Sequence, residues 1–487
     1  MRAVKPEKRM ITRRNFLKAG AVVGASSLIP KTFASGVHTG TKDGRPNILL
    51  IFTDQQTLNA MSAAGNPWLR TPNMDSLARF GVRFEKSVCA SPICTPARGT
   101  LVTGVMPHNH GAVYNSTGCD WEHVPRMGRL FKDGGYRAVW AGKWHLPSSY
   151  PILPNQTLST QIPDFELLPF FKDGLSSSIS WAKGDDTDGP LADAVTDWFR
   201  RGQSQPFMLS VSFHNPHDIC YFPSQQNLYP EPLNLDAAPP LPENYEIPAD
   251  EPEFLQDCRT RDHYGNEVRA AQKMDAAQWR RYLYNYYRMT ERVDEQVGRV
   301  IRALEKAGQD ENTLIIFTSD HGDGAASHRW AAKLSLYQEP VSVPFIVTQF
   351  GRTRENITDR EHLVSGLDVL PTMLDYAGIA IPAACQGRSV RPLVEGRAAD
   401  WRDFVVTELA VDPKRPERQG RMVRTAQYKY NVYSYGARNE QLFDLASDPG
   451  EMINLSARPE LQNEMIRHRA LLKKWMEKTN DPFEVRI

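Results

Sequence analysis

The chain contains a series of short apolar runs, and several of them end at polar side chains. The first run, residues 47–53, reads Asn-Ile-Leu-Leu-Ile-Phe-Thr and stops at Asp54. A nearly continuous apolar run of this length is typical of a strand that is buried on both faces of a parallel sheet. Similar runs cover residues 138–141, 207–213, 314–318 and 344–347. These runs predict the core strands of one sheet.

Helical patterns lie between the apolar runs, at residues 73–80, 126–132, 191–200 and 276–307. Strands that alternate with helices predict an α/β fold with a large, mostly parallel central sheet flanked by helices. Ligands of such sheets bind at the carboxyl ends of the strands. Because Asp54, His214–His217 and Asp320–His321 all follow strand ends, we expect them to share one site.

The character of the sequence changes near residue 400. Short antiparallel strands are expected at residues 404–407, 422–433 and 441–445, with a final helix at 460–478. We therefore predict a catalytic domain over residues 45–400 and a smaller C-terminal α+β subdomain over residues 401–487. Residues 225–257 are rich in Pro, Glu and Asn, which predicts a long surface loop beside the site.

The N-terminus carries a twin-arginine pattern at Arg13 and Arg14. The apolar stretch that follows, residues 19–30, is too short for a stable membrane-spanning helix, and Ala34 offers a small residue before a cleavage point. We predict that residues 1–34 are a signal peptide read by the twin-arginine export machinery, and that the protein is a periplasmic or secreted bacterial enzyme. No other stretch of the sequence predicts a membrane span.

The charges nearly cancel, with 58 Lys and Arg residues against 57 Asp and Glu residues and a net charge of +1. A general nucleic-acid binder usually carries a basic excess, so we expect no nucleic-acid partner. The six cysteines show no CxxC pair, which argues against a zinc ribbon, and their spacing does not reveal a disulfide pairing.

The strongest motif is Cys94-Thr95-Pro96-Ala97-Arg98 followed by Thr103-Gly104. On this motif the chain resembles the type I, formylglycine-dependent sulfatases of the alkaline-phosphatase-like superfamily. The resemblance implies that a separate formylglycine-generating enzyme oxidises Cys94 to formylglycine (3-oxoalanine). One hydroxyl of the aldehyde hydrate would attack sulfur, and the other would drive release of sulfate, so a hard step becomes two easier ones. Pro96 would lie in a first helical turn, which places Cys94 at the positive end of a helix.

Carboxylate and amide oxygens suit Ca²⁺ or Mg²⁺ better than zinc. The resemblance implies that Asp54, Gln55, Asp320, His321 and the group derived from Cys94 surround one divalent ion. We expect Ca²⁺, with Mg²⁺ as the alternative. Gln55 and His321 stand where many sulfatases have Asp and Asn, which leaves the identity of the ion open.

The resemblance also implies the remaining catalytic residues. Lys143 would bind sulfate oxygens, and His145 would be the base that triggers collapse of the sulfated intermediate. His217 would protonate the leaving group, a contribution of roughly 10²–10⁴-fold for a poor leaving group. Lys333 would bind sulfate and assist that protonation. Together with Arg98 and the metal, these lysines would form a cationic pocket for sulfate.

Two further residues are expected near the substrate. Asn115 occupies a position that lines the substrate pocket in relatives, and His328 would either line the pocket or lie on the surface. Trp121, Trp330 and Tyr221 are candidates for stacking on a sugar ring. Exported bacterial sulfatases more often act on sulfated glycans than on soluble aryl sulfates, so we expect a carbohydrate sulfate ester as substrate.

Two other readings of the same motifs remain open. Phosphonate monoester hydrolases and phosphodiesterases of the superfamily can carry the same oxidised cysteine and the same Asp-Gln and Asp-His pattern. The alternative that is not an enzyme is a binding protein for sulfated glycans in which Cys94 is never oxidised.

Overall fold

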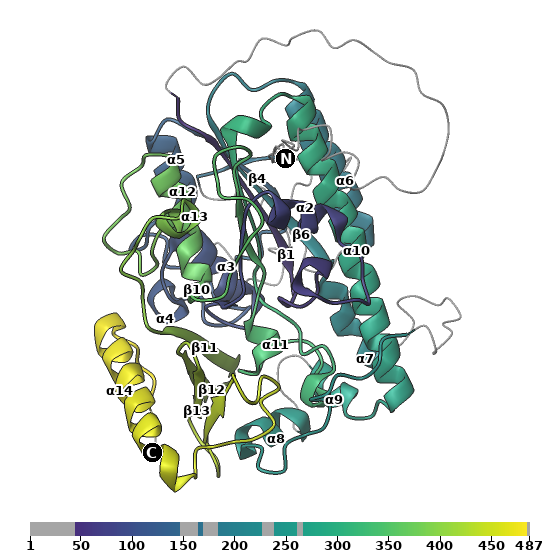
Figure 1. Ribbon diagram of the computed structural model, residues 1–487, viewed down its shortest axis with the longest axis vertical. Helices are drawn as coiled ribbons and strands as arrows, with labels where there is room; N and C mark the ends of the chain where they lie inside the picture. Colours follow the sequence, from purple (N-terminus) through teal and green to yellow (C-terminus); the bar gives the residue numbers. More distant parts are fainter. Residues whose placement is uncertain (1–43, 147–163, 169–183, 226–237, 261–265, 485–487) are drawn as a thin grey trace, which may run out of the picture.

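The computed structural model describes residues 44–146, 164–168, 184–225, 238–260 and 266–484 (Figure 1). The signal peptide expected over residues 1–34 lies outside this part of the chain. An eight-stranded sheet runs through the centre of the molecule. In spatial order its strands are β5 (Glu166–Leu167), β4 (Arg137–Gly142), β6 (Phe207–Pro216), β1 (Asn47–Asp54), β7 (Thr313–Ser319), β8 (Phe345–Thr348), β2 (Val82–Phe84) and β9 (Ile357–Asp359).

The centre of the sheet is parallel, as predicted. β1 pairs in parallel with both β6 and β7, and β4 pairs in parallel with β6. The run at residues 344–347 was expected to be another parallel strand, and this is wrong, because β8 is antiparallel to β7. A parallel pair needs a crossover connection, usually a helix of a dozen residues or more. The chain between β7 and β8 forms only short helical turns, including α11 (Gln338–Val341), so it supplies no crossover helix.

Successive side chains of β1 point to opposite faces of the sheet, and each face is covered by helices. Ile48, Leu50 and Phe52 face one core, whereas Leu49 and Ile51 face the other. The first core is covered by α3 (Cys94–Thr103), α5 (Met127–Asp133) and α12 (Val369–Tyr376), and the second by α2 (Pro72–Arg79), α6 (Gly184–Arg200) and α10 (Ala276–Lys306). Figure 1 shows α5 and α12 on one side of the sheet and α6 and α10 on the other.

The predicted helices therefore exist, and one is longer than expected. α6 begins at Gly184 and continues through Pro190, whereas the sequence pattern placed its start at residue 191. Smaller elements complete the fold: β3 (Ser87–Val88), β10 (Val364–Ser365), α4 (Pro107–His110), α7 (Phe222–Gln225), α8 (Glu253–Thr260), α9 (Glu267–Ala271) and α13 (Arg391–Val394).

A second, antiparallel sheet follows residue 400, as predicted. Its strands are β11 (Val405–Asp412), β12 (Arg415–Arg424), β13 (Tyr428–Tyr433) and β14 (Glu440–Asp444), and the helix α14 (Gln462–Thr479) follows them. β11 contacts the segment that precedes Cys94, because Thr407 Oγ1 donates to the carbonyl of Cys89 at 2.7 Å and the amide of Glu408 donates to that of Ala90 at 2.8 Å. This sheet thus supports the start of α3, and the division at residue 400 stays a prediction.

The loop expected over residues 225–257 is only partly a surface loop. Residues 226–237 lie outside the described residues, and α8 begins at Glu253. Glu251 is buried and pairs with Arg259 at 2.7 Å, so this stretch is anchored in the protein by a charge pair. All six cysteines are in their free form. Among the described residues, no helix has the length and apolar character that a membrane crossing requires.

Candidate active site

Arg98 connects four neighbouring strands. Its Nη2 lies 2.7 Å from Asp54 Oδ2 at the end of β1, and its Nε lies 2.8 Å from Asp320 Oδ2 directly after β7. Its Nη1 donates to Ser212 Oγ on β6 and to the carbonyl of Lys143 after β4, both at 2.9 Å. Removing one partner from a buried charge pair typically costs roughly 3–5 kcal/mol. Arg98 therefore holds the two carboxylates in place and ties α3 to the sheet.

Cys94 is the first residue of α3, and Pro96 lies in the first turn, as the sequence predicted. The sulfur of Cys94 lies 2.8 Å from Lys333 Nζ, 3.2 Å from His321 Nε2 and 3.8 Å from Asp54 Oδ1. Cys94 is fully buried. Residues that are 40, 227 and 239 positions away in the sequence thus meet at one sulfur atom.

The surroundings of Cys94 favour a negative charge. Burial and Asp54 raise the pKa of the thiol, but Lys333, His321 and Lys143 outweigh both and hold that pKa well below its usual range. The start of a helix adds to this effect, because its unpaired amides carry partial positive charge. An anionic oxygen in place of the sulfur would meet the same stabilisation.

Lys143 and His145 follow the end of β4. Lys143 Nζ lies 2.7 Å from Asp54 Oδ2. Burial lowers the pKa of His145 to about 4, although the hydrogen bond between its side chain and Cys94 acts in the opposite direction. A neutral imidazole that contacts the reacting position can accept a proton from it.

The donor set fits a divalent metal ion. One ligand atom from each of Asp54, Cys94, Asp320 and His321 lies within 4.8 Å of the others. His321 Nδ1 is 2.8 Å from the carbonyl of Gly322, and Nε2 is the ring nitrogen that faces Cys94. In the neutral ring that carbonyl would keep the proton on Nδ1, and the lone pair of Nε2 would then bind the metal. Burial and the charge of Asp54 raise the pKa of Asp320 to about 6, an effect that a bound cation would reverse.

Asp323, which the sequence reasoning missed, orients Gln55. The carboxamide nitrogen of Gln55 donates to Asp323 Oδ2 at 2.8 Å, so its oxygen faces Lys333 Nζ at 3.3 Å. Tyr282 on α10 donates to both oxygens of Asp323, at 2.7 and 2.8 Å, and accepts from the amide of Ala332 at 3.0 Å. These bonds give Gln55 one orientation, with its oxygen available as a ligand.

The backbone of Gln55 is fixed as well. Gln55 has a φ of 70°, a left-handed conformation that is uncommon outside glycine. Its amide donates to Asp320 Oδ1 at 3.1 Å, and its carbonyl accepts from the hydroxyl of Tyr286 at 2.8 Å. Strained backbone persists where surrounding bonds determine it, and such positions cluster at functional sites.

His217 reaches the same cluster from the end of β6. Burial raises the pKa of Asp54, but Lys143, His217 and the other neighbouring cations hold that pKa well below its usual range. Asp218, also missed from the sequence, accepts from His214 Nε2 at 3.0 Å and lies 3.5 Å from His217 Nδ1. The two histidines therefore share one carboxylate that sets their orientation.

Of the residues predicted to contact substrate, Asn115 lies at the start of α3, and His328 and Trp330 are buried. Asn115 lies against the start of α3, where its side-chain oxygen accepts from the amide of Thr95 at 2.9 Å. His328 is not on the surface, because its buried ring stacks on Tyr337 with the ring centres 3.9 Å apart. Trp330 is also fully buried, so the expectation that it stacks on a sugar is wrong. A substrate role for Asn115 or His328 stays a prediction.

The structure thus brings together the expected ligands and catalytic side chains around Cys94: Asp54, Gln55, Arg98, Lys143, His145, His217, Asp320, His321 and Lys333. A buried cluster of this kind, with two carboxylates, three histidines, Arg98 and two lysines, can bind a tetrahedral anion together with a metal ion. The individual roles of these residues stay predictions.

Comparisons with known proteins agree with this geometry. The sulfatase family model matches residues 46–379, and the model of the N-sulphoglucosamine sulphohydrolase C-terminal region matches residues 326–480. A model of the twin-arginine translocation signal sequence matches residues 10–30. The protein is therefore exported, to the periplasm or beyond it.

Individual relatives cover nearly the whole chain. The delta 4,5-hexuronate-2-O-sulfatase of Bacteroides thetaiotaomicron is 31% identical over 453 residues, with 90% of each chain covered. A solved 2-O GAG sulfatase has a TM-score of 0.78 and 29% identity, covering 90% of this chain and 93% of its own. The phosphonate monoester hydrolase of Agrobacterium radiobacter shares the fold, with a TM-score of 0.75 at 24% identity over 89% of this chain and 96% of its own. The chain therefore belongs to the sulfatase family of the alkaline-phosphatase-like superfamily and is a sulfuric ester hydrolase.

Proposed function

We propose that this enzyme hydrolyses a sulfate ester on a sulfated carbohydrate, with a nucleophile made from Cys94 and a bound divalent cation. The observation that carries the proposal is the position of Cys94, which is buried at the start of a helix and contacts Lys333 and His321. The hexuronate sulfatase relative supports a carbohydrate substrate.

The nucleophile requires oxidation of Cys94 by a formylglycine-generating enzyme. The hydrated aldehyde supplies an oxygen nucleophile that a thiol does not. Lys333 lies where it would stabilise a deprotonated oxygen, because its Nζ is 2.8 Å from the present sulfur. His145, with its pKa lowered to about 4 by burial, is neutral near pH 7 and accepts the proton whose removal releases sulfate.

The metal would be held by Asp54, Gln55, Asp320 and His321, and we propose Ca²⁺, with Mg²⁺ as the alternative. A bound cation supplies charge that polarises a sulfate oxygen and acidifies the nucleophile. Lys143 Nζ is 2.7 Å from Asp54, one of the proposed metal ligands, and would bind a second sulfate oxygen.

The leaving alcohol needs a proton, because a sugar alkoxide is a poor leaving group. His217 is the proposed donor, held by Asp218, and Lys333 assists it. The partners are therefore a sulfated glycan, the generating enzyme and the twin-arginine export machinery.

We expect Cys94→Ala to abolish sulfate ester hydrolysis, because the variant has no residue to oxidise. Its melting temperature should change little. The measurement is kcat/KM for 4-nitrophenyl sulfate and, in parallel, for a phosphate diester, with enzyme from a host that has the generating enzyme. The matched control is Cys258→Ala, which removes a buried thiol in the core. Full activity of Cys94→Ala would contradict the mechanism, and a wild-type preference for the diester would favour the phosphodiesterase alternative.

We expect His217→Ala to lose roughly 10²–10⁴-fold in kcat on an alkyl sulfate and far less on 4-nitrophenyl sulfate, because only the poor leaving group needs a proton. Steady-state kinetics on the two substrates give the comparison, and the exposed His123→Ala serves as control. Equal losses on both substrates would show that His217 positions the substrate instead of protonating the alcohol.

We expect Asp323→Ala to weaken Ca²⁺ binding by roughly 10–100-fold, because the Gln55 carboxamide loses the bond that orients it. Calorimetric titration of the metal-free protein measures this affinity without any turnover. Asp294→Ala is the control: Asp294 is a buried carboxylate that binds the start of α2, so its loss should lower stability and leave Ca²⁺ affinity unchanged. Unchanged affinity in Asp323→Ala would rule out the orienting role.

A further inference from the structure

A cavity of about 330 Å³ lies between α14 and the segment that leads into β11. One wall is formed by Lys474, Trp475 and Lys478 of α14, and the other includes Arg388. Neither wall contains a residue of the cluster around Cys94. The cavity is therefore separate from the active site.

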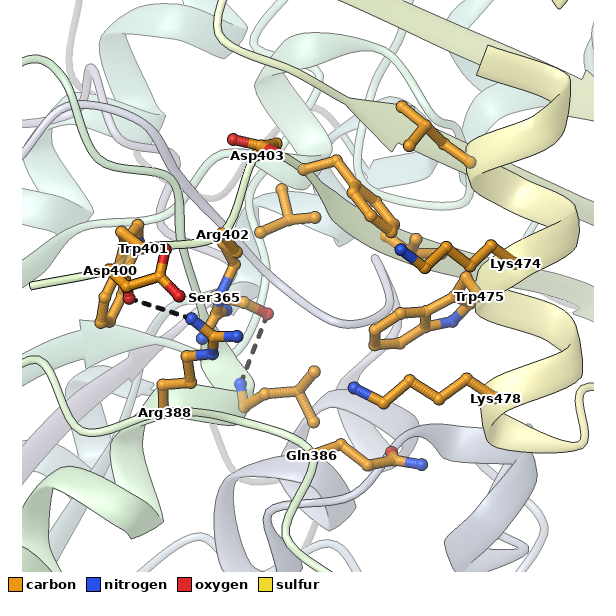
Figure 2. A pocket seen from close by; sticks show the side chains of 15 residues that line it. Ser365, Gln386, Arg388, Asp400, Trp401, Arg402, Asp403, Lys474, Trp475 and Lys478 are labelled. Carbon is orange, nitrogen blue, oxygen red and sulfur yellow. Dashed lines mark hydrogen bonds between the residues drawn. The ribbon is translucent and has the colours of Figure 1, made fainter. Parts of the chain in front are cut away.

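The charged residues of the α14 wall are both cationic. Lys474 and Lys478 are one helical turn apart and so lie on one face of α14. Figure 2 shows both side chains extending toward the cavity, with the ring of Trp475 between them. Both lysines are exposed, and in the described part of the chain no carboxylate lies within ion-pair distance of either ammonium group. Lys473, next to them, instead lies 3.9 Å from Glu477 and does not line the cavity.

The opposite wall adds one available cation. Arg402 is neutralised by Asp368, to which both of its terminal nitrogens donate. Arg388 donates through Nη1 to the backbone carbonyl of Asp400 at 3.1 Å, which leaves its other donors for a ligand. The carboxylates of Asp400 and Asp403 belong to this wall, so the net positive charge is concentrated on the α14 side.

The cavity also offers an aromatic surface. Trp475 is half-buried and packs edge-on against Phe404, with the ring centres 6.3 Å apart. An aromatic ring flanked by two ammonium groups can contact the apolar face of a sugar while the charges bind its sulfate groups. Two cations one turn apart are better matched to a ligand with several anionic groups than to one small ion.

We propose that this cavity is a second, non-catalytic binding site for a sulfated saccharide. The inference rests on the proposed function, because a sulfated glycan substrate carries sulfate groups beyond the one at Cys94. Lys474, Lys478 and Arg388 bind those sulfates, and Trp475 contacts the sugar. The site holds the polymer on the enzyme between turnovers and increases its local concentration at the active site.

The test measures binding of the full-length enzyme to dextran sulfate, with unsulfated dextran as the blank, at fixed ionic strength. We expect the Lys474→Ala/Lys478→Ala double variant to bind roughly tenfold more weakly, because two charge-assisted contacts are lost. Its kcat/KM on 4-nitrophenyl sulfate should equal that of the wild type. The control is Arg467→Ala/Lys473→Ala, which removes the same charge from exposed positions of α14 outside the cavity.

Equal weakening of dextran sulfate binding in the two double variants would mean that binding follows overall charge, and this would overturn the proposal. Unchanged binding in Lys474→Ala/Lys478→Ala would overturn it as well. Competition with inorganic sulfate at matched ionic strength separates the two sources of sulfate. If inorganic sulfate displaces dextran sulfate as well as a sulfated disaccharide does, the cavity is an inorganic anion site and the proposal fails. The two proposals can fail separately. If the wild type turns over no sulfate ester, and the Lys474→Ala/Lys478→Ala variant still binds dextran sulfate more weakly than the wild type does, the binding site is supported and the proposed function is rejected.

Discussion

The site depends on the bonds that Arg98 makes to four adjacent strands. Because Arg98 follows Cys94 by one helical turn, the contacts that tie α3 to β4, β6, β1 and β7 also bring Cys94 next to Asp54. The arginine therefore pairs with both carboxylates, and Lys143 adds a second cation at Asp54. Lys143 contacts Asp54 and Lys333 contacts Cys94, so both lysines belong to the same cluster.

Much of this arrangement could be predicted from the sequence, because apolar runs mark the buried strands and helical patterns lie between them. Residues 48–52 are apolar on both faces of β1, as expected for a strand that is covered on both sides. Parallel strands end at one edge, so Asp54 and Asp320 had to lie close together once their strands were recognised. The motif at Cys94 then indicated the chemistry, and α3 begins where Pro96 predicted it.

The rest depended on contacts that leave no local pattern. Asp323 meets Gln55 across 268 residues, and Tyr282 lies on the buried face of α10, where an aromatic residue reads as core. Trp330 was a candidate for stacking on a sugar, yet it is fully buried in a core together with Tyr337. The antiparallel direction of β8 follows from a connection without a crossover helix, and the apolar run itself carries no direction.

The proposed nucleophile is an oxygen that replaces the sulfur of Cys94. The most direct measurement is the mass of the proteolytic peptide that contains Cys94, taken from active enzyme. We predict the mass that results when the thiol and one hydrogen are exchanged for an aldehyde oxygen, in a fraction of the peptide that rises with specific activity. A fully active preparation in which this peptide carries only an unmodified thiol would contradict the proposed oxygen nucleophile.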